Sequence, residues 1–463
     1  MPQSSSQSGR ARDSVTMVPG MGRPSGASTH PVLVWVGGAD NAVPPSCSRV
    51  VEFDQRLFIG RHPPDEMEPD LRTWVVPDRL LSSEHAEISE VEGSWELCDL
   101  ESRNGSVVDA VSAQPRLKLR DGSMIFVGSQ VAIFHVLTDA ERAAIAEELR
   151  DPVAPVPTCN PALAMLCSML KKLAPTDGEI LLTGETGAGK EVYAHAIHRL
   201  SGRQGKLVAI NCAAVPRELV ESELFGYLRG AHSQANASKT GIIEEAEGGT
   251  LFLDEIGDMA PELQTKLLRF TQDRMLTPLG GTRAKRVDVR IVAATSRTSA
   301  PQSGQGGLRQ DLAARLGAEP IRIPPLRDRL EDLGALIGFF LGDRVKPFDQ
   351  QAFQALALHA WPGNVRELQK VLTTAEALSR ESPKILPEHL PQAIAATPRR
   401  IRASPVGRAM RPPPSAIELE DVIRRFEGNM MRVARELDRK PALVYRWAKR
   451  YKINVDSFRK KEI

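Results

Sequence analysis

The chain has 463 residues, 41% of them hydrophobic and 25% charged, which is typical of a globular protein with two to four domains. No apolar run approaches the roughly 18 residues of a membrane-spanning helix, so we expect no membrane partner. The net charge of +2 is unevenly spread, because residues 396–463 carry 18 lysines and arginines against 8 acidic residues, and such a basic tail favours nucleic acid as a partner.

Residues 1–30 predict a disordered tail, since they are rich in Ser, Gly and Pro and lack the apolar stretch of a secretory signal. The five cysteines are odd in number and no pair has CxxC spacing, which argues against a disulfide framework and against a zinc site. Both observations favour a reducing cytoplasm as the location of the protein.

Residues 31–137 predict an antiparallel β-sandwich. Short runs rich in β-branched and aromatic residues alternate with turn sequences such as EGS and SRNG. The runs are PVLVWVGG, RLFIGR, AEISEV, SWELCDL and VAIFHVL. Residues 138–159 follow as a linker, which comprises a helix at DAERAAIAEELRD and a proline-rich joint.

Residues 160–396 predict an α/β domain. The near-continuous apolar runs EILLTG, KLVAINC, GGTLFLDE and DVRIVAATS are typical of buried parallel strands, and helical stretches lie between them. Residues 397–413 are basic and proline-rich, so we expect an extended linker. Residues 414–463 have a helical pattern and predict a small all-α domain.

The stretch LLTGETGAGKE contains a phosphate-binding loop of the form GxxxxGK between an apolar strand and a helix. Its glycines let backbone N–H groups surround phosphates, and Lys190 places a positive charge at the β- and γ-phosphate oxygens of ATP. Glu191 stands where Ser or Thr is usual, so Mg²⁺ must be held largely by other groups. The predicted ATP-binding residues of the loop are Gly184, Glu185, Thr186, Gly187, Ala188, Gly189, Lys190 and Glu191.

A second apolar strand, GGTLFLDE, ends in two carboxylates. In a nucleotide-hydrolysing site Asp254 is placed to hold Mg²⁺, and Glu255 is placed to polarise the attacking water. Together with Lys190, these residues predict an enzyme that binds ATP and Mg²⁺ and hydrolyses ATP.

These motifs resemble those of bacterial enhancer-binding proteins, the AAA+ activators of the sigma-54 form of RNA polymerase. The resemblance covers roughly residues 181–368, with the motifs in the family's order. They are GETGAGKE, INCAAV, ESELFG, GGTLFLDEIGD, LQTKLLR, VDVRIVAAT, LRQDLAARL, IPPLRDR and WPGNVRELQ. The resemblance implies an AAA+ P-loop ATPase with a helical lid, which works as a homo-oligomeric ring, typically a hexamer.

The resemblance also implies roles for single residues. Asn211 resembles the switch residue that restrains Glu255. Arg309 and Arg315 resemble arginine fingers, which act on the ATP of a neighbouring subunit. Arg366 resembles the nucleotide-sensing arginine of the lid.

The chain departs from the family's pattern in two places. Ser296 stands where the family usually carries Asn, and its shorter side chain leaves open whether its hydroxyl reaches the same partner. The loop that touches sigma-54 reads GAFTGA in the family and GAHSQA here, which removes its apolar tip and replaces a glycine whose backbone freedom the loop needs. The loop residues are Gly230, Ala231, His232, Ser233, Gln234 and Ala235.

Residues 31–137 resemble a forkhead-associated (FHA) domain, a phosphothreonine reader built on a β-sandwich. The matching motifs are IGR, LSSEHAEI, SRNGS and LRDGSMIFVG. The resemblance implies that a phosphothreonine-containing protein, or a phosphorylated segment of this chain, binds there, because guanidinium groups and hydroxyls pair well with a phosphate dianion. The implied phosphopeptide-binding residues are Arg61, Ser82, Ser83, Arg103 and Asn104, with His85 as a structural brace.

The stretch GNMMRVARELDRKPALVYRWAKRY resembles a Fis-type helix-turn-helix. Such a motif places its second helix in the major groove of double-stranded DNA, where polar residues reach bases and phosphates. The residues that we expect to face DNA are Arg439, Lys440, Tyr445, Arg446, Lys449 and Arg450.

The leading interpretation is a phosphothreonine-responsive, ATP-hydrolysing, DNA-binding regulator that acts on sigma-54 RNA polymerase from an upstream, enhancer-like site. The altered loop favours an alternative, in which the chain binds DNA but does not engage sigma-54 and acts with another polymerase form or as a repressor. The DNA-binding tail disfavours a third interpretation, a general AAA+ remodeller of unrelated substrates.

Overall fold

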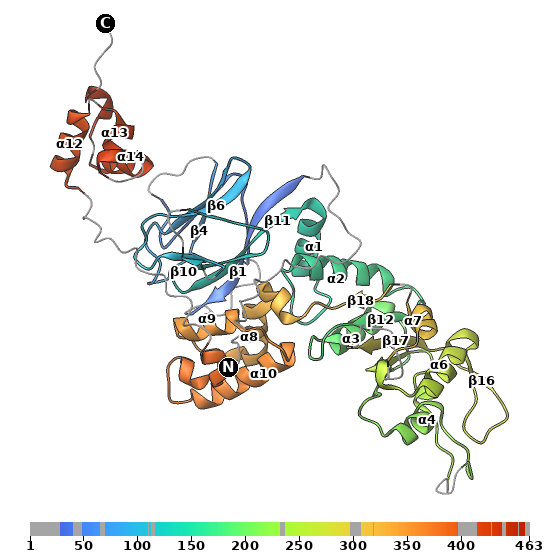
Figure 1. The fold of residues 1–463 in the computed structure, drawn as a ribbon. Helices are drawn as coiled ribbons and strands as arrows, with labels where there is room; N and C mark the ends of the chain where they lie inside the picture. Colours follow the sequence, from blue (N-terminus) through green and yellow to red (C-terminus); the bar gives the residue numbers. More distant parts are fainter. Residues whose placement is uncertain are drawn as a thin grey trace, which may run out of the picture. The chain divides into compact units, whose positions relative to one another are not determined.

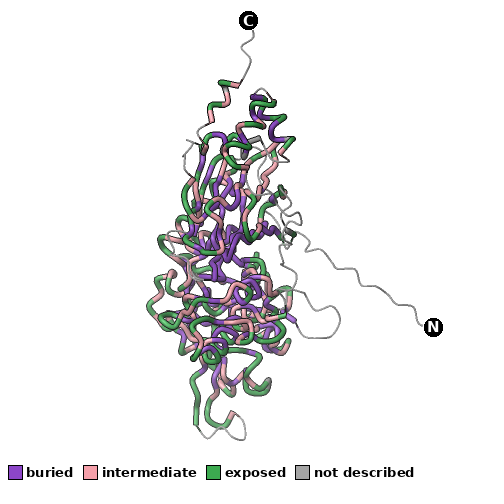
Figure 2. Tube along the Cα trace, turned by 90° about the vertical axis from the view of Figure 1, so that its left-hand side faces the viewer, coloured by how far each residue is buried: buried purple, intermediate pink, exposed green. Residues whose placement is uncertain are grey.

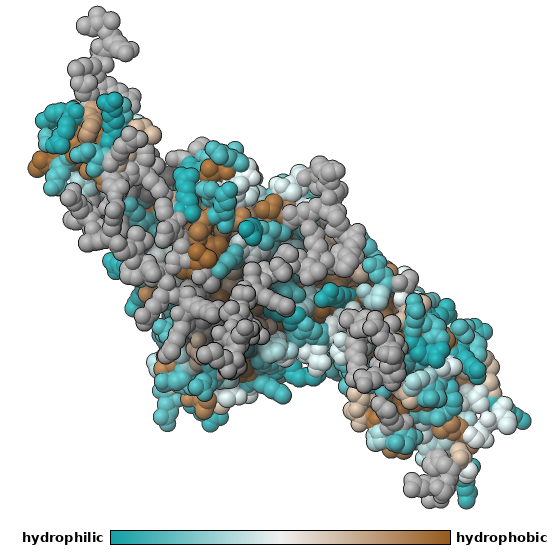
Figure 3. Space-filling view, viewed as in Figure 1, coloured by the Kyte–Doolittle hydropathy of each residue, from teal (hydrophilic) through white to brown (hydrophobic). Residues whose placement is uncertain are grey.

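The computed structural model divides into two compact units, Met1–Pro405 and Val406–Ile463 (Figure 1). It describes residues 28–39, 49–64, 70–109, 111–112, 116–231, 237–296, 307–317, 319–396, 414–426, 428–437, 441–451 and 453–458. Within these residues no helix is long and apolar enough to cross a membrane. Hydrophilic residues cover most of the described surface that faces the viewer in Figure 3.

The first unit begins with a sandwich of two β-sheets. The strand order is β2-β1-β11-β10-β7-β8 in the first sheet and β4-β3-β5-β6-β9 in the second. The strands of the first sheet are β1 (Thr29–Gly38), β2 (Val50–Glu52), β7 (Ser106–Val108), β8 (Val111–Ser112), β10 (Ser123–Val127) and β11 (Gln130–Thr138). Those of the second are β3 (Arg56–Gly60), β4 (Leu71–Val75), β5 (Ala86–Val91), β6 (Ser94–Asp99) and β9 (Arg116–Lys118).

The predicted sandwich is confirmed, but the expectation that it is antiparallel is wrong at one pair of strands. β3 and β4 run parallel, with Arg56 opposite Leu71 and Gly60 opposite Val75. A hairpin turn cannot join parallel neighbours, so the chain must return to the same end of the sheet between Gly60 and Leu71. Turn composition in the sequence does not report the direction of pairing, so this exception was not predictable from it.

The first sheet of the sandwich is buried on both faces. On β1, Leu33 and Trp35 point into the sandwich interior, whereas Val34 and Val36 pack outside it. Every residue from Pro31 to Gly38 is therefore buried. Antiparallel sheets commonly keep one face in solvent, so a sheet buried on both faces must be covered by another part of the chain. Buried residues gather in the interior and exposed ones on the surrounding loops in Figure 2.

The α/β part contains a five-stranded sheet with the order β13-β14-β17-β12-β18, and its neighbouring strands run parallel, as predicted. Its strands are β12 (Ile180–Thr183), β13 (Leu207–Asn211), β14 (Thr250–Asp254), β17 (Arg290–Thr295) and β18 (Ile321–Arg322). Side chains on the two faces of β14 enter different cores: Phe252 packs with α2 and α3, whereas Leu251 and Leu253 pack with α4 to α7. This alternation explains the continuous apolar runs of the sequence.

The helices around this sheet follow the predicted alternation with strands. They are α2 (Pro161–Leu173), α3 (Lys190–Ser201), α4 (Arg217–Phe225), α5 (Ile242–Glu245), α6 (Pro261–Asp273) and α7 (Gln310–Leu316). The preceding helix α1 (Asp139–Arg150) packs instead against α2 and the first sheet of the sandwich. A small hairpin, β15 (Met275–Leu276) with β16 (Lys285–Arg286), follows α6. Asn160 caps α2 by accepting from the Leu163 N–H, and Pro161 occupies the first helical turn, where its missing N–H costs nothing.

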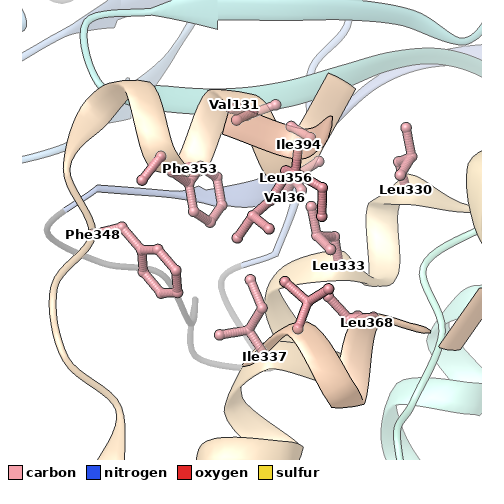
Figure 4. Packing of buried hydrophobic residues seen from close by; sticks show 14 of the residues in the cluster. Val36, Val131, Leu330, Leu333, Ile337, Phe348, Phe353, Leu356, Leu368 and Ile394 are labelled. Atoms are coloured by element: carbon pink, nitrogen blue, oxygen red, sulfur yellow. The ribbon is translucent and has the colours of Figure 1, made fainter. Parts of the chain in front are cut away.

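The last part of the first unit is a helical lid. It comprises the short turns η3 (Leu326–Asp328) and η4 (Leu330–Asp332) and the helices α8 (Leu333–Leu341), α9 (Gln350–Leu358), α10 (Asn364–Leu378) and α11 (Gln392–Ala395). The lid core contains Phe348, Phe353 and Trp361, and it continues without a break into Val36 and Val131 of the sandwich (Figure 4). The lid thus covers one part of the outer sandwich face, and α1 and α2 cover the part around Val34.

The second unit is a small helical domain. Its helices are α12 (Ala416–Arg425), α13 (Met430–Glu436) and α14 (Pro441–Arg450), followed by the short turn η8 (Val455–Phe458). Ser415 begins α12 with a capping box, since its hydroxyl accepts from the Glu418 N–H while the Glu418 carboxylate accepts from Ser415. Val433 of α13 and Val444 and Trp447 of α14 are buried in a shared core.

Candidate functional site

The phosphate-binding loop lies between the end of β12 and the start of α3. Gly187 and Gly189 have φ angles of 78° and 100°, in the left-handed region that favours glycine. A Cβ atom at Gly187 would lie 2.4 Å from the Gly363 carbonyl oxygen of the lid. The loop therefore needs glycine both for its curvature and for the close approach of the lid.

Lys190 connects the loop with the carboxylates of β14. Its Nζ atom donates to the Gly184 carbonyl at 3.0 Å and to Glu255 Oε1 at 3.3 Å. The side chain is only 6% exposed. A buried ammonium group with one carboxylate partner and two backbone carbonyls around it is well placed to exchange those contacts for phosphate oxygens.

Asp254 and Glu255 lie side by side at the end of β14. Burial, followed by the neighbouring charge of Glu255, raises the pKa of Asp254. Burial also pushes the pKa of Glu255 upward, but the hydrogen bonds from Ser296 and the charge of Lys190 outweigh it, and the net effect is a lowered pKa. Glu255 has a φ of 51°, and left-handed backbone at a non-glycine residue is a strain typical of functional sites.

The carboxylates that Asn211 and Ser296 contact differ from those that we expected. We expected Asn211 to restrain Glu255, but its Nδ2 donates to Asp254 Oδ2 at 3.0 Å. Ser296 holds Glu255 instead: its backbone N–H and its hydroxyl both donate to Glu255 Oε2, at 2.9 and 2.8 Å. The shorter serine side chain thus reaches a carboxylate partner, because the end of β17 brings its backbone close to Glu255.

Mg²⁺ fits the residues present. Asp254 is a half-buried carboxylate whose charge is disfavoured by Glu255 and by Glu191, so a divalent cation would stabilise the ionised pair. The described ranges contain no group of three or more His, Cys, Asp or Glu side chains that could hold a metal by themselves. The two adjacent carboxylates suit Mg²⁺, which usually binds one or two carboxylates together with nucleotide phosphates and water.

The phosphate loop is held in place by three residues to which the motifs assign no role. Arg327 pairs with the Glu185 carboxylate at 2.8 and 2.5 Å, and this contact lowers the pKa of Glu185 to about 2. Arg329 donates to the Ala188 carbonyl at 2.6 Å. Asn364 donates to Glu185 and to the Thr186 carbonyl, both at 3.1 Å. Arg329 and Asn364 are buried, and buried polar residues need partners, so the motifs PLRDR and WPGN contained a signal for these two residues.

The predicted arginines occupy two different places. Arg366 lies beside the phosphate loop, because its Cβ would be 3.1 Å from a Cβ added at Gly187. Arg309 pairs with Asp311 at 2.8 Å, and Arg315 donates to the Thr271 carbonyl at 2.8 Å. Both finger candidates belong to the α7 segment, where Arg315 is exposed and Arg309 is partly exposed.

The FHA-like sandwich brings most of its predicted site residues together around Ser82. The Arg61 N–H donates to the Ser82 carbonyl at 3.0 Å, and the Arg103 N–H donates to the Ser82 hydroxyl at 3.0 Å. Asn104 Nδ2 donates to the Leu80 carbonyl at 2.7 Å. The remaining predicted residue, Ser83, is exposed next to this cluster.

His85 braces that cluster, as expected. Burial lowers the pKa of His85, so its imidazole is neutral at pH 7. Its Nδ1 accepts from the Ser82 N–H at 3.2 Å, which places the proton on Nε2, facing the Gly105 carbonyl at 3.2 Å. The ring thereby ties the Ser82 loop to the loop that contains Arg103 and Asn104.

Two predicted groups are only partly described. Of the GAHSQA loop, Gly230 and Ala231 are described, with Gly230 at a φ of 81°, while His232, Ser233, Gln234 and Ala235 lie outside the described residues. Arg439 and Lys440 also lie outside them. On α14, Tyr445 and Lys449 are exposed, as a DNA-facing position requires. The side chains of Arg446 and Arg450 are not among those described.

Comparison with known proteins defines the class to which this architecture belongs. Residues 157–322 match the family described as "Sigma-54 interaction domain", residues 327–404 match "AAA+ ATPase lid domain", and residues 57–128 match "FHA domain". The transcriptional regulatory protein GlrR of Escherichia coli is 36% identical over 413 residues, which cover 87% of this chain and 90% of GlrR. The chain therefore belongs to the family of sigma-54-dependent transcriptional regulators.

Individual relatives share different parts of the chain. The DNA-binding transcriptional regulator NtrC of Rhizobium meliloti is 48% identical over 224 residues, or 47% of this chain and 46% of NtrC. The match thus spans about half the length of that relative. A crystal structure of NtrX from Brucella abortus in complex with ATP is 31% identical, covering 67% of this chain and 74% of that one, with a TM-score of 0.46.

Proposed function

We propose that this chain is a phosphothreonine-responsive, ATP-hydrolysing regulator that binds DNA upstream of a promoter and remodels RNA polymerase. It works as a homo-oligomeric ring, and the sigma-54 form of the polymerase is its leading target. The observation that carries the proposal is the cluster of Lys190, Asp254, Glu255 and Ser296 at the phosphate loop of a sigma-54 interaction domain.

The geometry suggests how the site works. Asp254 would hold the Mg²⁺ that accompanies ATP, and this ion would offset the negative charge of the phosphates. Lys190 then exchanges Glu255 for phosphate oxygens, which frees one carboxylate oxygen of Glu255. Because its lowered pKa keeps Glu255 ionised at pH 7, this oxygen can accept a proton from water. Ser296 keeps the other oxygen in place.

Two substitutions test the ATPase. Lys190→Ala removes the phosphate-binding charge and Glu255→Gln removes the base, so each is expected to lower ATP turnover at least a hundredfold. Glu255→Gln should still bind nucleotide, whereas Lys190→Ala should bind it weakly. Lys172→Ala, an exposed lysine on α2, is the control and should keep wild-type turnover. Turnover that survives in both site variants would refute the assignment.

The phosphopeptide site is supported by the cluster of Arg61, Ser82, Arg103 and Asn104 on two neighbouring loops. Arg61→Ala should abolish binding of a phosphothreonine peptide measured by calorimetry, while Arg116→Ala, on the exposed strand β9, should leave it unchanged. Screening a phosphothreonine peptide library with the wild-type chain decides the proposal, and equal binding of unphosphorylated peptides would overturn it.

DNA binding is supported by the basic composition of residues 397–463 and by the three-helix core of the second unit. Arg446→Ala on α14 is expected to weaken binding of duplex DNA by roughly 1–3 kcal/mol if the residue contacts a base. The measurement is a salt titration of binding, since each lost phosphate contact lowers the slope by about one. An unchanged affinity and an unchanged salt slope would show that Arg446 does not contact DNA and would contradict the placement of α14 in the interface.

The loop sequence GAHSQA favours a second candidate function, in which the ring does not engage sigma-54. Restoring the family's loop with His232→Phe, Ser233→Thr and Gln234→Gly separates the two. The ring is trapped with a transition-state analogue of ATP, and co-elution with sigma-54 is measured. Co-elution of the wild type supports the leading function, whereas co-elution of the restored variant alone supports the second.

A further inference from the structure

We propose that the FHA-like sandwich completes the nucleotide site, with Arg49 as a positioning residue that holds Arg329 against the phosphate loop by way of Asp332. The inference rests on the proposed ATP binding, and it adds that a residue outside the ATPase sequence belongs to the support of that site. It is carried by contacts that run from Arg49, directly before β2, through the turn of residues 329–332 to the loop between β12 and α3.

Arg49 reaches out of the sandwich into the start of the lid. Its Nη1 donates to the Pro157 carbonyl at 3.1 Å. Its Nη2 donates to the Glu331 carbonyl at 2.5 Å and lies 3.4 Å from Asp332 Oδ1. The Arg49 and Asp332 side chains are only 1% and 4% exposed, so neither charge has water as an alternative partner.

Asp332 depends on two arginines from different parts of the chain. Burial raises the pKa of Asp332, and the charges of Arg49 and Arg329 oppose that rise. The carboxylate also accepts from the Thr158 hydroxyl at 2.7 Å and from the Cys159 N–H at 3.0 Å. These neutral donors satisfy its oxygens but do not balance its charge. Arg49 forms the ion pair with this carboxylate, and the charge of Arg329 acts on it from a longer distance.

Arg329 carries the arrangement to the nucleotide site. It is 6% exposed and lies in the turn that joins η3 to η4, where the Asp332 N–H donates to the Arg329 carbonyl at 3.1 Å. Its guanidinium donates to the Ala188 carbonyl in the phosphate loop. The loop backbone immediately before Lys190 is thereby fastened to the same turn that Arg49 holds from the other side.

Apolar side chains also pack between the sandwich and the lid and fix their relative position. Val36 and Val131 pack against Leu330 and Leu333, directly before and after the Glu331–Asp332 pair (Figure 4). Phe348 donates its N–H to the Ala39 carbonyl at 2.7 Å on the opposite side of this contact. These contacts therefore hold the segment that carries Arg49 in a fixed position relative to the lid.

Removing the Arg49 charge leaves Asp332 with a single counter-ion. Arg329 is then drawn from the Ala188 carbonyl toward Asp332, and the phosphate loop loses one of its fastenings. The expected consequence is weaker nucleotide binding with a largely unchanged rate of hydrolysis at saturation, because none of the atoms at Lys190, Asp254 or Glu255 is altered.

The test uses the full chain. Arg49→Met is compared with the wild type for ADP affinity by calorimetry and for the KM and kcat of ATP turnover. We expect Kd and KM to rise about tenfold, with kcat within about twofold of the wild type. Arg116→Met, an exposed arginine of the same sandwich that pairs with Glu96, is the matched control and should match the wild type.

Two further variants distinguish positioning from loss of folding. Arg49→Met combined with Asp332→Asn removes the uncompensated charge of Asp332. The double variant should therefore recover most of the lost ADP affinity. If each substitution simply disturbed the fold, the two losses of affinity would add. Arg49→Lys keeps the charge and should lose less affinity than Arg49→Met; it decides the question if the methionine variant does not fold. Wild-type ADP affinity in Arg49→Met, or no recovery in the double variant, overturns the inference. A wild-type chain that binds no nucleotide refutes the proposed ATPase instead.

Discussion

Ser296 controls the position and ionisation of Glu255 through two hydrogen bonds from one residue. The backbone N–H would form its bond with any residue other than proline at this position, so the identity of the side chain decides only the hydroxyl contact at 2.8 Å. Hydrogen bonds to an ionised acceptor favour the charged form and lower its pKa. The departure from the family's Asn therefore keeps a restraint on the carboxylate rather than losing it.

Ser296→Ala is predicted to raise the pKa of Glu255, since the hydroxyl is one of the groups that lower it. The acidic limb of the pH profile for ATP turnover should consequently move to higher pH, while the basic limb stays in place. The control is Ser201→Ala at the end of α3, whose hydroxyl contacts the His198 carbonyl. An acidic limb that does not move in Ser296→Ala would show that the hydroxyl has no influence on this carboxylate.

At the scale of elements, the contact between β11 and the turn η4 joins the sandwich to the lid through charges as well as apolar side chains. His135 lies between Asp121 on its own sheet and Glu331 of the lid, at 3.0 and 2.7 Å. Although burial disfavours the charged ring, the two carboxylates raise the pKa of His135 to about 9. Protonated His135 thus links the two parts at neutral pH.

The His135 contact predicts a pH dependence of stability. Its pKa is about 9 in the folded chain and near 6.5 in an unfolded one, so its contribution of about 3 kcal/mol is complete below pH 6.5 and is lost as the pH rises through 9. The melting temperature of the wild type should fall more between pH 7 and 9.5 than that of His135→Gln. His195→Gln, an exposed histidine on α3, should behave like the wild type. Equal slopes in wild type and His135→Gln would contradict the prediction.

At the scale of the whole molecule, the two arginines of the α7 segment bear on the proposed ring. Arg309 and Arg315 contact Asp311 and Thr271 within the chain, whereas Lys190 and Glu255 lie at the phosphate loop. A guanidinium supplied by a neighbouring subunit would add the charge that the transition state of phosphoryl transfer needs. The proposed ring follows from this division of the site between subunits.

A mixing experiment tests that division. Arg309→Ala lacks the finger but keeps its own nucleotide site, and Lys190→Ala lacks the site but keeps the finger, so each alone should be inactive. Random mixed rings should recover roughly a quarter of wild-type turnover, because half of the sites are intact and half of their neighbours supply a finger. Mixing Lys190→Ala with itself at twice the concentration is the control. If mixed rings form but remain inactive, the finger does not act between subunits.

Much of the fold and of the candidate site was predictable from contiguous motifs. The run GETGAGKE specifies its own loop, because the glycines set the local backbone and the flanking strand and helix set its direction. The parallel strands were predictable as well, because their unbroken apolar runs indicate burial on both faces. Contacts between distant segments were not predictable in this way: Asn211 was expected on Glu255 and lies on Asp254.

The sequence by itself determined the chemical groups of this protein and the elements that carry them, since propensity, periodicity and glycine placement act over short distances. Only the tertiary structure decided which groups meet. The apolar run SMIFV in β10 indicates a strand that is buried on both faces. The sequence does not show that the lid is the part of the chain that packs against its outer face. Likewise, nothing around Arg49 indicated that Asp332 would be its partner, because two charges far apart in the chain become a pair only when packing removes both from water.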